Sequence, residues 1–101
     1  MGLRSAAPRV LAGLAVVLVG ERPDSCLYVS RKQEAAERAG IACEVHRLAQ
    51  DVSQEALCAK VASLCADSAV DGVIVQLPLP KHLDEEVIGA LSTGNRDFLA
   101  G

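Results

Sequence analysis

Residues 14–20, Leu-Ala-Val-Val-Leu-Val-Gly, form a continuous apolar run that ends in a glycine. A short run that is rich in valine and lacks polar alternation is typical of a strand buried on both faces of a sheet. A second run of this kind, Gly-Val-Ile-Val at residues 72–75, lies later in the chain. Strands of this kind need helices on both faces of their sheet, so the two runs indicate an α/β fold.

Residues 25–40 have the pattern of an amphipathic helix. The preceding Glu-Arg-Pro-Asp-Ser reads as a turn, in which Pro23 is tolerated and either Asp24 or Ser25 is expected to cap the helix. Gly40 is expected to close it, because glycine adopts the left-handed conformation that ends many helices.

A second strand and a second helix are predicted to follow. Residues 41–48 alternate between two faces, which indicates a strand that is exposed on one side or lies at an edge. Ser53 is expected to cap the next helix, and Glu55 in its first turn favours the helix dipole. The predicted buried stripe of this helix comprises Leu57, Val61, Leu64 and Cys65.

The third strand should stop sharply, because Pro78 and Pro80 cannot continue a central strand. Residues 82–91 look like a short third helix, with its acids near the N-terminal end and Gly94 closing it. The order strand–helix three times over predicts right-handed crossovers. The expected fold is therefore α/β, a three-layer open parallel sheet in a βαβαβα order whose strand arrangement is left open.

Composition excludes several classes of function. The chain has 101 residues, enough for one domain, and a net charge of −3 without a basic stripe, so neither nucleic acid nor a membrane is an expected partner. No apolar stretch approaches the ~18 residues that a membrane span needs. The four cysteines form no Cys-x-x-Cys pair, so we expect reduced thiols and no metal. The acids at residues 84–86 are interpreted as a solvated helix face rather than metal ligands.

Three features are predicted to meet at one edge of the sheet, because the carboxyl ends of parallel strands lie at the same edge. Ligands of open parallel sheets bind beyond these strand ends. They are the turn at residues 20–25, the pair Tyr28 and Lys32 one helical turn apart, and Gln76 at the end of the third strand. Each has a simpler interpretation: Lys32 as a solvated lysine, Tyr28 as a cap on the core, and Gln76 as an amide tied to the backbone. No Gly-x-Gly-x-x-Gly, Walker or Gly-x-Ser-x-Gly motif is present.

Two motifs carry a family resemblance. Val19-Gly20 is followed by Ser-x-x-Tyr-Val-x-x-Lys at residues 25–32, and residues 76–80 read Gln-Leu-Pro-Leu-Pro. Over residues 14–91 the chain resembles the bifunctional methylenetetrahydrofolate dehydrogenase/methenyltetrahydrofolate cyclohydrolase family, in its N-terminal folate-binding catalytic domain. The resemblance implies oxidation of methylene- to methenyltetrahydrofolate with NAD(P), then hydrolysis to the 10-formyl form.

The resemblance also implies roles for the site residues. Lys32 would be the catalytic lysine, Gln76 would orient and tune it, and Tyr28 would stack on the aminobenzoate ring of the folate. The further substrate-binding residues would be Ser25, Leu77 and Pro78. This chemistry is consistent with a partly desolvated lysine, whose lowered pKa allows it to exchange protons.

Both ends of the chain depart from the family pattern. Residues 1–13 are interpreted as an N-terminal tail or a truncated leading helix, and residues 92–101 as a divergent tail. Where the family has Lys-Asp-Val-Asp-Gly, Arg96-Asp97 can mimic the first two residues, and Leu99 or Ala100 takes the place of the second aspartate. We expect the chain to lack the C-terminal NAD(P)-binding Rossmann domain that the resemblance implies for the family, and therefore to bind no cofactor by itself. A truncated or spliced product and an inaccurate gene prediction both stay open.

The expected function is therefore that of a one-carbon folate enzyme fragment, inactive by itself as a dehydrogenase. Its expected partners are the folate substrate and either a second copy or a full-length relative, in the cytoplasm or in mitochondria. The alternative is a non-catalytic α/β domain that dimerises with or modulates a full-length relative. A flavodoxin-like regulatory domain is a third interpretation, which Glu21 and Asp24 match poorly.

Overall fold

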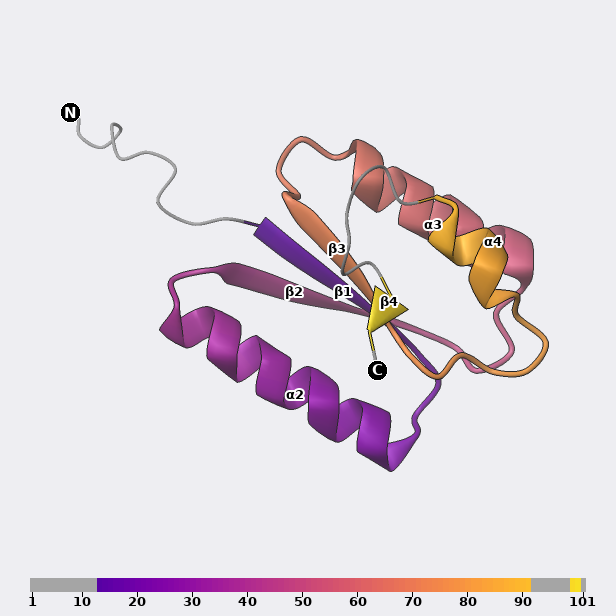
Figure 1. Cartoon of the computed structure of the whole chain (residues 1–101), viewed down its shortest axis with the longest axis horizontal. Coiled ribbons are helices and arrows are strands. Elements are labelled where there is room, and N and C mark those ends of the chain that lie inside the picture. Colours follow the sequence, from indigo (N-terminus) through magenta and orange to yellow (C-terminus); the bar gives the residue numbers. More distant parts are fainter. Residues whose placement is uncertain (1–12, 92–98, 101) are drawn as a thin grey trace.

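The computed structural model describes residues 13–91 and 99–100. A parallel sheet in the order β2-β1-β3-β4 forms its centre (Figure 1). The elements follow the chain as β1 Gly13–Val19, α2 Pro23–Arg38, β2 Ala42–Leu48, α3 Gln54–Ala66, β3 Gly72–Gln76, α4 Glu85–Gly89 and β4 Leu99–Ala100. The predicted parallel α/β sheet is confirmed, and the short β4 beside β3 is an addition to it.

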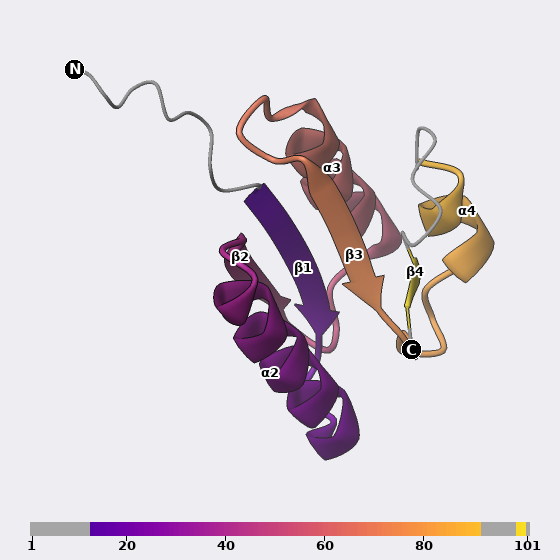
Figure 2. The same ribbon diagram turned by 60° about the vertical axis from the view of Figure 1, so that its left-hand side comes forward.

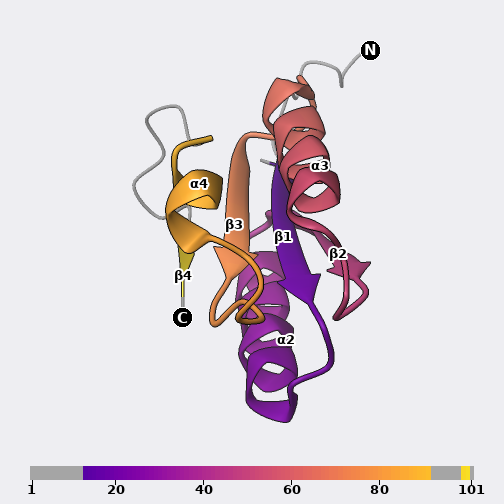
Figure 3. The same cartoon turned by 90° about the vertical axis from the view of Figure 1, so that its right-hand side faces the viewer.

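Helices cover both faces of the sheet, as the apolar runs required. Helix α2 lies on one face, and α3 and α4 lie on the other (Figures 2 and 3). Successive residues of β1 alternate between these two layers: Val16 packs near Val29 of α2, whereas Val17 joins the cluster that contains Leu57 and Ile88. The predicted three layers are therefore confirmed, with β1 at the centre.

The first helix begins earlier than its sequence suggested. Arg22 occupies the N-cap position without a side-chain cap bond, and Pro23 is the first helical residue, so the predicted caps Asp24 and Ser25 are wrong. Proline has no N–H to satisfy and a backbone angle already suited to a helix, which lets it start the first turn. At the other end Gly40 has φ +78°, the predicted left-handed closure.

The second helix follows its prediction apart from one residue. Ser53 Oγ accepts a hydrogen bond from the backbone N–H of Ala56 at 3.1 Å, which confirms the predicted cap. Leu57, Val61 and Leu64 are buried, but Cys65 is exposed. Cys65 follows Leu64 directly, and one residue turns a helix by about 100°, which takes its side chain out of the stripe.

The third helix is shorter than the predicted residues 82–91. It spans Glu85–Gly89, and the side chain of Asp84 caps it by accepting hydrogen bonds from the N–H groups of Glu86 and Val87. Leu83, in the preceding loop, is buried in the core on this side of the sheet. The proposed closure at Gly94 lies outside the described residues.

Candidate functional site

The strand ends and the first helix bring a lysine and an amide into direct contact. Lys32 Nζ on α2 donates a hydrogen bond to Oε1 of Gln76, the last residue of β3, over 2.7 Å. These residues are 44 positions apart in the sequence. The predicted meeting of Lys32 and Gln76 at one edge of the sheet is therefore confirmed, and the simple interpretation of Lys32 as a fully solvated lysine is wrong.

Gln76 is held so that its carbonyl oxygen faces the lysine. The residue is only 1% exposed, and its Nε2 donates to the backbone oxygen of Leu77 at 3.1 Å. Because an amide nitrogen only donates and an amide oxygen only accepts, this second bond fixes which end points at Lys32. A buried amide needs such partners, which explains how a polar residue is tolerated after Val73-Ile74-Val75.

The surroundings of Lys32 favour loss of its proton. Burial lowers the pKa of the Lys32 ammonium, because a charged group loses its hydration there. The partner that the structure records for it is the neutral amide of Gln76 rather than a carboxylate. Lys32 is thus a group that can exchange a proton while its nitrogen stays in place.

The other predicted binding residues surround this contact in different ways. Tyr28, one turn before Lys32 on α2, is 44% exposed and so presents its ring to solvent. Leu77 is partly buried against the core, and Pro78 is exposed after a cis Leu77–Pro78 peptide bond. Ser25 is 2% exposed, and its Oγ has no hydrogen-bond partner in the described part of the chain. The substrate-binding roles of these residues remain predictions.

The same edge has features that the sequence did not indicate. Arg22 Nε and Asp24 Oδ1 form an exposed ion pair at 2.6 Å at the start of α2. A hollow of ≈ 420 Å³ lies between the ends of β1 and β2, where Arg47 reaches to 3.9 Å from the sulfur of Cys26. Nothing local marked Arg47, because its proximity to the end of β1 depends on the order of the strands. The only sequence feature that pointed to this hollow is the Val-Gly ending of β1. Gly20, at that ending, has φ +84°.

Within residues 13–91 and 99–100, no group of three or more His, Cys, Asp or Glu side chains is placed to hold a metal ion. Asp84 caps α4, and Glu85 Oε2 accepts from the N–H of Leu79 at 3.3 Å, so both carboxylates stabilise this loop. The four cysteines carry free thiols. None of the helices in the described ranges has the length and apolar character that a membrane crossing requires.

Relatives of known family share both this sequence and this fold. Residues 3–97 match the family described as tetrahydrofolate dehydrogenase/cyclohydrolase, catalytic domain. Bifunctional protein FolD of Magnetococcus marinus is 54% identical over 81 residues, which are 79% of this chain and 28% of that protein. The FolD protein of Phenylobacterium zucineum is 47% identical over 89 residues, 88% of this chain and 30% of that one.

Solved structures of FolD enzymes resemble this chain in their fold as well. The bifunctional FolD methylenetetrahydrofolate dehydrogenase/cyclohydrolase of Campylobacter jejuni superposes with a TM-score of 0.82 at 38% identity, covering 85% of this chain and 30% of its own. The Trypanosoma brucei enzyme, solved with NADP and an inhibitor, gives 0.79 at 35% identity, covering 82% and 28%. The chain spans less than a third of the length of these relatives. By sequence match over most of its length, the chain belongs to the tetrahydrofolate dehydrogenase/cyclohydrolase family, within the region of its catalytic domain.

Proposed function

We propose that this chain forms the folate-binding part of a methylenetetrahydrofolate dehydrogenase/methenyltetrahydrofolate cyclohydrolase, with Lys32 as its proton-transfer group. The observation that carries the proposal is the 2.7 Å hydrogen bond between Lys32 Nζ and Gln76 Oε1. It joins the two family motifs through the very residues to which the resemblance assigns the chemistry. Family membership supports folate as the substrate class.

Hydrolysis of the methenyl bridge requires both a base and an acid. A water molecule adds to the bridging carbon and gives up a proton. The bond from that carbon to N5 then breaks while N5 gains a proton, and the proton of the new hydroxyl group leaves to solvent as the formyl C=O forms. The Lys32 amine accepts the first proton, and the resulting ammonium returns one to N5. A lowered pKa raises the fraction of amine available for the first step. Gln76 holds Nζ in place for both transfers.

Tyr28 provides the binding surface for the flat part of the folate. Its ring is partly exposed one helical turn from Lys32, a rise of about 5.4 Å along α2. That spacing suits neighbouring parts of one ligand, and an aromatic ring is well suited to stacking. We assign Ser25, Leu77 and Pro78 to the walls of the same site.

Dehydrogenation requires in addition a nicotinamide cofactor close to the methylene carbon. The hydride acceptor has to lie within a few ångströms of that carbon, and the sequence has no dinucleotide-binding motif. In the relative from Trypanosoma brucei the cofactor is NADP. We therefore expect this chain to show dehydrogenase activity only together with a cofactor-binding domain.

Calorimetric titration with a folate analogue tests binding, and methenyltetrahydrofolate hydrolysis tests catalysis. We expect Lys32→Met to abolish hydrolysis with little change in affinity. Tyr28→Ala should weaken binding by about 1 kcal/mol through loss of stacking. Lys60→Met, the same substitution on α3 across the sheet, is the matched control and should change neither property.

Two results would overturn the proposal. Hydrolysis by Lys32→Met at the parent rate would remove the role of the lysine. The absence of saturable folate binding by the parent chain would instead favour a non-catalytic domain that dimerises with or modulates a full-length relative.

A further inference from the structure

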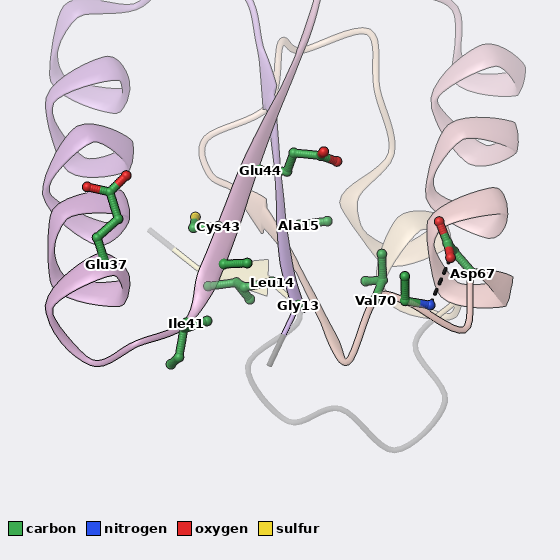
Figure 4. A pocket seen from close by; sticks show the side chains of 11 residues that line it. Gly13, Leu14, Ala15, Glu37, Ile41, Cys43, Glu44, Asp67 and Val70 are labelled. Atoms are coloured by element: carbon green, nitrogen blue, oxygen red, sulfur yellow. Dashed lines mark hydrogen bonds between the residues drawn. The ribbon is translucent and has the colours of Figure 1, made fainter. Parts of the chain in front are cut away.

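A cavity of ≈ 490 Å³ opens at the amino end of the sheet, opposite the Lys32 site (Figure 4). The first residues of β1 and β2 form its floor, and the last turn of α2 and the segment after α3 form its sides. We call this space the amino-end cavity. Its apolar wall includes Leu14, Ile41 and Val70. None of the residues that the family motifs single out lines it.

The charged residues around the amino-end cavity are all acidic. Glu37, Glu44 and Asp67 line it, and none of its eleven lining residues is lysine or arginine. Glu44 Oε1 lies 3.0 Å from His46 Nε2, and Asp67 Oδ1 accepts from the N–H of Ala69 at 2.9 Å. The Glu37 carboxylate has no recorded hydrogen bond or ion pair with residues 13–91. Burial and the nearby Glu37 raise the pKa of the Cys43 thiol, which also lines the cavity.

The start of β1 is fixed at the mouth of this cavity. The N–H of Gly13 donates to Asp71 Oδ2 at 2.6 Å, and the N–H of Asp71 donates to the Gly13 oxygen at 2.7 Å. A Cβ atom on Gly13 would collide with the backbone oxygen of Ala69. The chain that precedes β1 therefore emerges from a fixed point in the cavity wall.

We propose that the amino-end cavity is the docking site for residues 1–12 of the same chain. This segment contains Arg4 and Arg9, no acidic residue, and the apolar pair Val10-Leu11 directly before Ala12. Its charge and apolar content complement the carboxylates and the apolar wall. Arg9 is four residues from Gly13, and four extended residues reach about 14 Å, enough to bring its guanidinium to the carboxylates.

Attachment to the cavity wall favours this occupant over a separate molecule. A segment tethered by a short link has an effective concentration in the millimolar range, so weak contacts suffice to keep it bound. The charge pairing is partly exposed and should weaken at high salt. The main alternative occupant of the amino-end cavity is the same segment of a second copy of the chain. Crosslinking distinguishes docking within one chain from docking between two chains.

Zero-length carbodiimide crosslinking of an Arg9→Lys variant tests the docking, because it joins only amines and carboxylates in contact. We expect the new amine to link to Glu37, Glu44 or Asp67 within one chain, with a yield that falls several-fold at high salt. Lys81, in the loop after β3, is the internal control and should not link to these acids. Links from position 9 mainly to residues 84–86 would overturn the proposal. In a mixture of isotopically light and heavy chains, links between copies would overturn it in favour of exchange between chains.

Cysteine alkylation provides an independent measurement without crosslinking. An Arg4→Gln/Arg9→Gln variant should expose Cys43, so that its alkylation accelerates several-fold relative to Cys58, which packs on the other side of the sheet. An unchanged ratio of the two rates would contradict docking. Equal acceleration of both would also count against it, because general unfolding would then explain the change.

Discussion

The contact between Lys32 and Gln76 can be measured as a coupling energy. In the Lys32→Met, Gln76→Met and double variants, apolar side chains of similar length replace the two partners. The wild-type bond is short, at 2.7 Å, and joins a charged donor to an acceptor that is 1% exposed. Hydrogen bonds to charged groups contribute about 1.5–3 kcal/mol, so we expect a coupling energy in this range at neutral pH.

Urea unfolding of the four proteins gives this energy as the non-additive part of the change in unfolding free energy. Each single variant also changes burial, but the cycle cancels that contribution. As Lys32 loses its proton at alkaline pH, the bond becomes a neutral one, and the coupling should fall towards about 1 kcal/mol.

A coupling energy below about 0.5 kcal/mol at neutral pH would refute the reasoning, because substitutions at independent sites add to within that margin. The matched control is a cycle between Lys60→Met and Gln76→Met. Lys60 lies on α3 and has no recorded contact with Gln76, so these two changes should add.

Three further outcomes follow from the contacts. Burial lowers the pKa of Lys32 in the folded chain, so between that lowered pKa and the ordinary value of 10.5 the unfolded chain binds more protons than the folded chain. Stability rises with pH wherever the unfolded chain binds more protons. In urea titrations, the stability of the wild type relative to Lys32→Met should therefore be flat at lower pH and rise with pH through this alkaline range. Gly13→Ala should lower the unfolding free energy by about 2–4 kcal/mol, because relieving the collision with Ala69 breaks both hydrogen bonds to Asp71. Gly72→Ala has ordinary contacts and should be neutral or stabilising by up to about 1 kcal/mol; equal losses for both glycines in denaturant melts would contradict this. Asp84→Ala should cost about 1 kcal/mol, measured in the same way, whereas Asp84→Asn, which retains a capping oxygen, should cost much less.

Much of the candidate site could be predicted because its determinants are local. Tyr28 and Lys32 share a helix face through their spacing alone, and the carboxyl ends of parallel strands always lie at one edge of the sheet. The glutamine in an otherwise apolar strand end marked a polar group in need of a partner. That this partner is Lys32, and that Leu77 fixes the orientation of the amide, depends on contacts that no local pattern encodes.

The sequence by itself determined the α/β class, the parallel direction of the strands and the ends marked by Ser53, Gly40 and the prolines after Gln76, because propensity and periodicity act over a few residues. Only the tertiary structure decided the order β2-β1-β3-β4, which places β1 at the centre and β2 at an edge. It also decided that Cys65 faces solvent and that acidic side chains from separate elements gather around the start of β1. These outcomes depend on which segments pack together across the whole chain, and that choice is made by the burial of the complete apolar surface rather than by any one segment.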